Sequence, residues 1–150
     1  MSRLALPVGL LCAWLAIASP VVAVPPDRQA LISSPFVDTS CGFEVDVSYP
    51  VQNEYAIAFF DQNGNLTRLV ITGRLVATFT NPANGVSLTE NISGPAQIDF
   101  VRGTAFGDGP GAGPVPALGS GIWLGFGRFD FVTGQTVGHF IPLCPPLAGT

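Results

Sequence analysis

The sequence has no lysine and only one histidine, so its six basic residues are all arginine. Its ten acidic residues leave a formal net charge of −4. Nucleic acids and anionic membrane surfaces are bound by clustered basic groups, and this chain offers none. We therefore expect neither of them as a partner.

Helical periodicity and long apolar runs are also missing beyond the N-terminal segment. No stretch there repeats its apolar residues with a sustained helical period. None approaches the roughly 18 consecutive apolar residues that a membrane-spanning helix needs. The sequence thus predicts neither a helical fold nor an integral membrane segment in the mature chain.

The motifs of several enzyme and cofactor classes are absent too. There is no G-x-S-x-G nucleophile turn, no G-x-G-x-x-G phosphate loop and no carboxylate spacing typical of a glycosidase. The run Asp61 to Asn65 superficially resembles a calcium loop, but its Gly64 is misplaced for an EF-hand, so we interpret it as a hairpin turn. We expect no cofactor and no metal site.

What the chain does have at its start is a targeting segment. Arg3 precedes an apolar run, and the residues before Ala23 fit the small-residue pattern of a signal peptidase site. We therefore assign residues 1–23 as a signal peptide and expect a secreted, extracellular product. Residues 24–40, which are rich in proline, are interpreted as an irregular arm with a single helical turn near Asp27 to Leu31, and residues 41–150 as one domain.

Removing the signal peptide discards Cys12 and leaves Cys41 and Cys144. In an oxidising compartment two remaining cysteines are expected to pair. A metal site would need more ligands than these two and the lone histidine. We predict a disulfide that ties the beginning of the domain to its end.

Alternation of apolar and polar residues predicts strands throughout the domain. It is clearest over residues 66–80, where Leu75, Ala77 and Phe79 share one side, and Asn84-Gly85 then provides the turn of a central hairpin. The remaining predicted strands cover residues 41–49, 54–60, 86–93, 97–106, 122–131 and 136–144, with Pro50 ending the first. Residues 107–121, GDGPGAGPVPALGSG, are interpreted as a long flexible loop.

About seven strands in meander order predict an all-β fold. A disulfide between the first and last strands would suit a small antiparallel up-and-down barrel, which is our first expectation. A β-sandwich is the alternative.

Two polar residues are candidate catalytic groups. Glu90 lies on the apolar side of its predicted strand, and His139 shares a side with apolar residues of the last strand. If both pointed into a barrel, they could act as acid and base in an isomerase or cyclase. A salt bridge for Glu90, with Arg68, Arg74 or Arg102, and a structural role for His139 are the alternatives.

Aromatic residues crowd both sides of the strand after the glycine-rich segment. Trp123, Phe126, Phe129 and Phe131 supply them. One set would fill the core while the other meets a ligand or a partner, unless other parts of the chain cover both. Trp123, Phe126 and Phe129 are therefore the candidate ligand-binding residues.

Short motifs resemble a group of small secreted actinobacterial β-proteins of unknown function. They are the CGF opening at 41–43, SLTENISGP at 87–95, the glycine-rich segment before an aromatic strand, and the final LC at 143–144. The resemblance implies export, a β-domain and the disulfide, and it transfers no catalytic residue.

Taken together, the sequence predicts a secreted, non-enzymatic β-domain. Its partner would be a small apolar ligand, with residues 107–121 as a lid, or an envelope or protein component. The alternatives are the isomerase-like enzyme using Glu90 and His139, and a protein-interaction module that pairs through an exposed strand edge.

Overall fold

The computed structural model describes residues 25–149, so the predicted signal peptide, residues 1–23, lies outside the described residues. Strands dominate what is described, and the prediction of an all-β, antiparallel fold is confirmed. The elements are β1 (Asp27–Leu31), β2 (Phe36–Asp38), β3 (Val45–Phe60), β4 (Leu66–Thr80), β5 (Ser87–Asn91), β6 (Ala96–Asp99), β7 (Thr104–Pro114), a 3-10 helix (Pro116–Leu118), β8 (Ile122–Asp130), β9 (Thr136–Pro142) and α1 (Cys144–Ala148).

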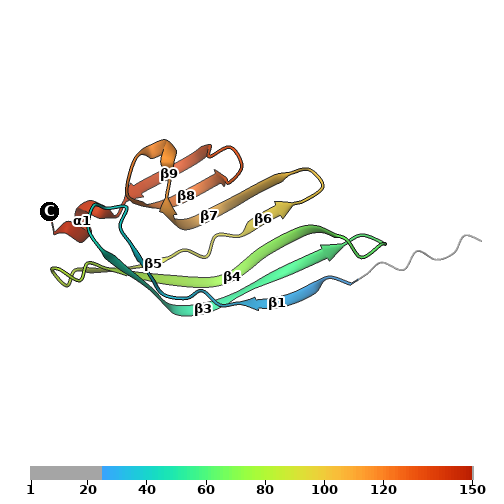
Figure 1. Cartoon of the computed structure of the whole chain (residues 1–150), viewed down its shortest axis with the longest axis horizontal. Coiled ribbons are helices and arrows are strands. Elements are labelled where there is room, and N and C mark those ends of the chain that lie inside the picture. Colours follow the sequence, from blue (N-terminus) through green and yellow to red (C-terminus); the bar gives the residue numbers. More distant parts are fainter. Residues whose placement is uncertain (1–24, 150) are drawn as a thin grey trace, which may run out of the picture.

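The sheet does not close, so the prediction of a barrel is wrong. Its strands follow the order β1-β3-β4-β6-β7-β8-β9, with β2 added to β3 and β5 added to β4. The sheet folds over so that β6 to β9 lie above β3, β4 and β5 as a second layer (Figure 1), which is closer to the sandwich alternative. The disulfide between Cys41 and Cys144 does form, but it joins the segment before β3 to α1. A disulfide fixes two Cα atoms, here 5.3 Å apart, and requires no strand pairing between them.

The long hairpin predicted at the centre is confirmed, and its first strand, β4, has the predicted bounds. Its alternation buries Leu75, Ala77 and Phe79. The predicted break at Pro50 is wrong, because β3 is one strand from Val45 to Phe60. A register shift between Ser48 and Val51 accommodates the proline as a bulge.

On its other edge, β4 pairs with two strands in succession. Its C-terminal half pairs with β5 and its N-terminal half with β6. Ser93 fills the gap between them, because its hydroxyl accepts from the Leu75 N–H at 2.9 Å and lies 3.1 Å from the Leu75 carbonyl. The single strand predicted over residues 97–106 is therefore two strands, β6 and β7, separated by a turn at residues 100–103.

The arm predicted to be irregular contains β1 and β2. Asp27–Leu31, where we expected a helical turn, pairs with Glu54 to Ala58 of β3. Phe36–Asp38 pairs with the beginning of the same strand. The long outer edge of β3 offers hydrogen-bond partners that a local reading of the arm could not anticipate.

The core lies where the two layers meet. Val45 and Val47 of β3 and Ala77 and Phe79 of β4 pack with four residues of the second layer and the C-terminal segment: Ile122, Leu124, Leu143 and Leu147. Each fully buried aliphatic side chain contributes about 1.5–3 kcal/mol through burial. The short helix α1 belongs to this core through Leu147, whose carbonyl accepts a hydrogen bond from the buried amide of Asn81 at 3.1 Å.

Candidate functional site

The glycine-rich segment forms a strand, so its prediction as a loop and a lid is wrong. β7 pairs with β8 continuously from Phe106 opposite Asp130 to Pro114 opposite Ile122. On its other edge, the carbonyl of Pro110 accepts a hydrogen bond from the Gly94 N–H at 2.6 Å. Strand pairing on both edges supplies the order that glycine and proline lack locally, and only a loop of residues 115–121 remains.

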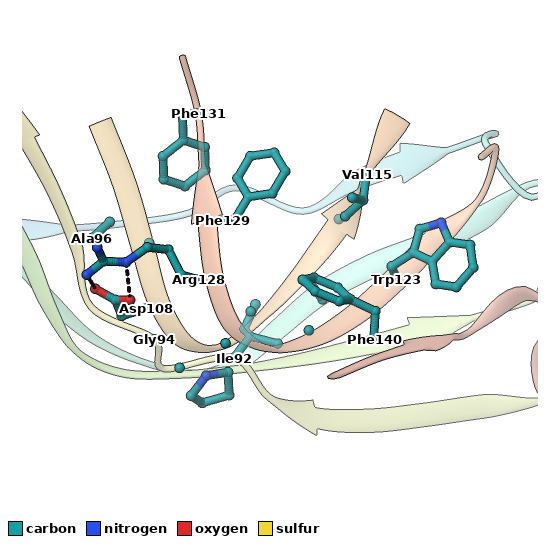
Figure 2. A pocket seen from close by; sticks show the side chains of 18 of the residues that line it. Ile92, Gly94, Ala96, Asp108, Val115, Trp123, Arg128, Phe129, Phe131 and Phe140 are labelled. Atoms are coloured by element: carbon teal, nitrogen blue, oxygen red, sulfur yellow. Dashed lines mark hydrogen bonds and ion pairs between the residues drawn. The ribbon is translucent and has the colours of Figure 1, made fainter. Parts of the chain in front are cut away.

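Because β7 carries glycine at every second position, one face of this layer is hollow. Residues paired across neighbouring strands point to the same side, and here Gly111 lies opposite Gly125 and Gly113 opposite Trp123. We call the resulting depression the glycine groove; it has a volume of about 370 Å³. Its floor is Gly107, Gly109, Gly111, Gly113, Gly125 and Gly127. Its aromatic walls are Trp123, Phe129, Phe131 and Phe140 (Figure 2).

The aromatic rings lie directly over parts of the glycine floor. A β-carbon at Gly125 would come within 2.6 Å of the Phe140 ring, and one at Gly107 within 3.3 Å of the Phe131 ring. Phe131 also meets Phe129 edge to face, with ring centroids 5.0 Å apart. Gly111 and Gly113 differ, because a β-carbon there would meet nothing within 4 Å. The open part of the groove therefore lies above these two glycines.

A charged pair borders the groove from the other face of the same two strands, because Asp108 and Arg128 alternate with the groove glycines and Arg128 shares a side with Phe126. Arg128 donates two hydrogen bonds to Asp108, from Nε at 2.8 Å and from Nη2 at 2.9 Å, and its guanidinium lies 4.4 Å from the centre of the Phe106 ring. The hydrogen bond from Arg128 lowers the pKa of the Asp108 carboxyl below its ordinary value. The side chains on the groove face itself are mainly apolar.

Trp123 has an unmet hydrogen bond. Its indole Nε1 is buried and has no acceptor among the described residues. A buried donor without a partner costs about 1–3 kcal/mol. The indole ring therefore lines the groove with its polar atom unused.

The structure separates the three predicted ligand-binding residues. Trp123 and Phe129 line the groove, as expected from the aromatic strand. Phe126 is exposed and is not a lining residue, because alternation along β8 turns it to the other face, opposite His139. Phe140 of β9 was not among the predicted residues, although it lies opposite Gly125 of β8 and lines the groove. Its position between His139 and Ile141, which alternate to the other side, was the signal in the sequence.

The two candidate catalytic residues do not meet. His139 is exposed, with Val137 and Ile141 exposed on the same side of β9, so the interior position considered for it is wrong. Glu90 is half-buried on β5 opposite Ala77, and no hydrogen bond or ion pair joins it to His139 or to an arginine in the described chain. The interior acid and base required by an isomerase-like site are not assembled.

Within residues 25–149, no three side chains of His, Cys, Asp or Glu are grouped to hold a metal ion. No helix in this part of the chain is long and apolar enough to cross a membrane. Comparison of the chain with protein-family models, curated proteins and solved structures found no match. The glycine groove is therefore the feature from which a function can be argued.

Proposed function

We propose that this protein is an exported, non-enzymatic binding domain whose glycine groove holds a small apolar ligand. The observation that carries the proposal is the groove itself, in which one indole and three phenyl rings stand around a floor of glycines. Few polar side chains line it, so burial of apolar ligand surface would drive binding.

The shape of the groove indicates the kind of ligand. A glycine floor lets a ligand lie against the backbone, and aromatic walls favour flat rings or methylene chains. Each buried methylene group contributes about 0.8 kcal/mol. A long-chain fatty acid supplies such a chain of methylene groups.

Export is supported by two features. The N-terminal segment has the pattern of a signal peptide, and the disulfide between Cys41 and Cys144 suits an oxidising compartment. Both are consistent with a domain that meets its ligand outside the cytoplasm.

Tryptophan fluorescence provides a direct test. The chain from residue 24 onward has Trp123 as its single tryptophan, because Trp14 lies in the predicted signal peptide. We expect palmitate to change the Trp123 emission in a saturable way and to raise the melting temperature.

A groove-filling variant makes the test specific. Gly111→Leu places a side chain over the open floor without a backbone clash, so it should fold but lose the palmitate response. Ala30→Leu, at an exposed position of β1, adds a leucine away from the groove and should respond like the wild type. Equal responses in Gly111→Leu and the wild type, or no response to palmitate or to any aromatic compound, would reject the proposal.

The open sheet favours a second candidate, which is strand addition. β9 ends the strand order, so its outer edge is unpaired in the described part of the chain. Amide hydrogen exchange at low and high protein concentration tests pairing between copies. Protection of β9 that grows with concentration would support it, whereas unchanged exchange would argue against it.

A further inference from the structure

Two pentapeptides that differ at a single position occur at the turns of two successive hairpins. Asp-Phe-Val-Arg-Gly spans residues 99–103 between β6 and β7, and Asp-Phe-Val-Thr-Gly spans residues 130–134 between β8 and β9. We call them the DFV turns. The two pentapeptides are identical at four of five positions.

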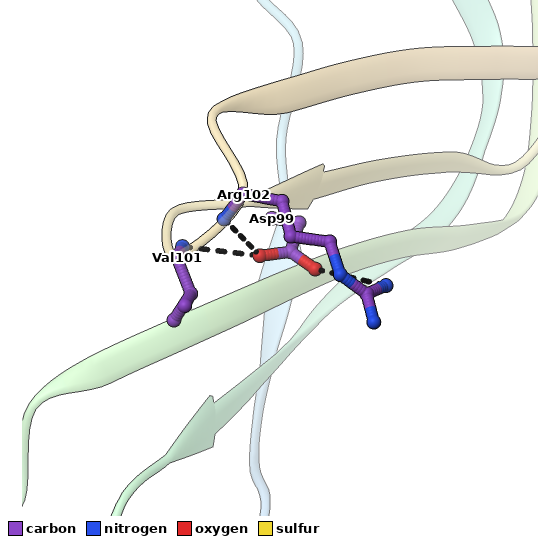
Figure 3. A network of polar contacts seen from close by, with 3 residues as sticks. All are labelled: Asp99, Val101 and Arg102. Carbon is purple, nitrogen blue, oxygen red and sulfur yellow. Dashed lines mark hydrogen bonds and ion pairs between the residues drawn. The ribbon is translucent and has the colours of Figure 1, made fainter.

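The two DFV turns have the same construction. In the first, the Asp99 Oδ1 accepts the N–H groups of Val101 at 3.0 Å and Arg102 at 2.8 Å (Figure 3). In the second, the Asp130 Oδ1 accepts those of Val132 at 2.8 Å and Thr133 at 2.9 Å. Each turn ends on a glycine with positive φ, 65° at Gly103 and 71° at Gly134. The aspartates thus serve the backbone. The side chains of Phe100, Val101 and Val132 are left exposed, whereas Phe131 also forms a wall of the glycine groove.

Both turns expose their apolar residues at the same end of the second layer (Figure 1). Val101 is 77% exposed and Val132 63%, and Phe100 and Phe131 are each about half exposed. The turns are also close in space, because the Phe131 N–H donates to the carbonyl of Ala105, two residues beyond the first turn, at 2.8 Å. They place exposed apolar side chains on two separate tips at this end of the layer.

The turn itself does not require these apolar residues. At the turn between β3 and β4, the Asp61 Oδ1 also accepts backbone N–H groups, from Asn63 at 2.9 Å and Asn65 at 2.8 Å. That turn carries Gln62 and Asn63 where the DFV turns carry Phe and Val. Phe100, Val101 and Val132 are therefore not needed to build the turn, and Phe131 already has a place in the glycine groove.

We propose that the two DFV turns dock this protein on a neutral phospholipid surface by inserting Phe100, Val101 and Val132 among the lipids. A backbone group without a hydrogen-bond partner is costly to insert into lipid. In each DFV turn, two backbone N–H groups already donate hydrogen bonds to the aspartate of that turn. Projecting tips suit a soft surface that closes around them. The guanidinium of Arg102, next to Val101, pairs with Asp99 at 3.7 Å but is 79% exposed, so it can also reach a lipid phosphate.

The charge of the chain selects the kind of lipid surface. A formal charge of −4 gives no general attraction to anionic lipids. Docking would be apolar in origin and would persist at high salt. It is independent of ligand binding in the glycine groove.

Cosedimentation with phosphatidylcholine vesicles tests the proposal. The chain from residue 24 onward is used, because the apolar N-terminal segment would itself bind lipid. We expect the wild type to sediment with the vesicles at low and high salt. The triple variant Phe100→Gln, Val101→Asn, Val132→Asn should partition at least tenfold less.

A matched control uses an exposed Phe-Val pair elsewhere. Phe36 and Val37 lie on β2, and Ile32, at 74% exposed, follows β1. The variant Phe36→Gln, Val37→Asn, Ile32→Asn removes the same apolar chemistry and should bind vesicles like the wild type. Gly111→Leu should also bind, which separates this result from the groove.

Three outcomes of the cosedimentation experiment would overturn the proposal. They are a wild type that stays in the supernatant, a DFV-turn variant that sediments as the wild type does, and a control variant that loses as much binding. A concentration-dependent dimer without vesicles, abolished in the DFV-turn variant, would assign this surface to a second copy of the chain and would also overturn it.

Discussion

Gly127 of β8 and Gly138 of β9 lie directly opposite each other, at a place where the two strands approach too closely for any side chain. A β-carbon on Gly127 would overlap the carbonyl oxygen of Val137, and one on Gly138 would overlap that of Phe126. Gly109 of β7 lies opposite Gly127, so a row of three glycines crosses three strands. This row shapes the layer that carries the glycine groove.

We predict that Gly138→Ala is strongly destabilising. Its φ of 140° is one that other residues rarely adopt, and the new methyl group would meet backbone atoms that cannot move independently. Backbone strain alone costs about 1–3 kcal/mol, and the overlap adds to it. Urea denaturation of the variant should therefore show a loss above this range.

Gly111→Ala is the matched control for that prediction. Its φ is not positive and a β-carbon would meet nothing within 4 Å, so the folded state accepts the methyl group. The unfolded chain loses conformational freedom, which should stabilise the protein by about 0.4–1 kcal/mol. If the two glycine variants lost stability equally, close packing at Gly138 would not be the cause.

Trp123→Phe should cost little stability although it changes a large side chain of the groove. The substitution removes some apolar contact but also removes the buried indole N–H that has no acceptor. Removing this unsatisfied donor should recover about 1–3 kcal/mol, which offsets much of the free energy lost with the apolar contact. We expect a net change below about 1 kcal/mol in urea denaturation, in contrast to a loss of about 3–5 kcal/mol for Phe79→Ala in the core. A loss as large as that of Phe79→Ala would mean that the indole N–H is satisfied.

The disulfide should be a major source of stability. It joins residues separated by 103 positions, and removing a native disulfide typically costs about 2–5 kcal/mol. We expect the double variant Cys41→Ser, Cys144→Ser to lose that amount. The wild type measured with a reducing agent should match the variant, and a loss below about 1 kcal/mol would contradict the prediction.

Ionisation of Glu54 should make the stability of the protein depend on pH, around the pH values at which carboxyl groups ordinarily ionise. Partial burial raises the pKa of Glu54, so the folded state binds its proton more tightly than the unfolded chain does. Stability should therefore fall as the pH rises from the unfolded pKa, about 4.3, through the folded pKa. Glu54→Gln should raise the melting temperature at neutral pH and lose this advantage in acid. An equal effect of the substitution at both pH values would exclude the carboxylate charge as its cause.

The same variant has a second readout at Tyr49. Burial raises the pKa of the Tyr49 hydroxyl, and the charge of Glu54 raises it further. Removing that charge in Glu54→Gln should lower the Tyr49 pKa towards its ordinary value, as measured by ultraviolet absorption. An unchanged tyrosine titration would show that the two groups do not interact.

Several elements could be predicted from the sequence because their signal is local. Alternation along residues 66–80 gave the bounds of β4, and the run after the glycine-rich segment predicted β8 and two of the groove aromatics, Trp123 and Phe129. The even number of cysteines beyond the predicted signal peptide predicted the disulfide. Each of these inferences depends on neighbouring residues or on simple chemistry.

The sequence by itself thus determined that the domain is built of strands, where most of them turn, and which cysteines pair. Only the tertiary structure decided that the sheet stays open, that β7 is a strand, and that Phe140 rather than Phe126 faces the groove. A glycine strand has no side-chain pattern to read, because its order comes from hydrogen bonds to β8 and to Gly94 and not from its own side chains. The facing of a strand side chain likewise depends on register and bulges, which are set by pairing between strands.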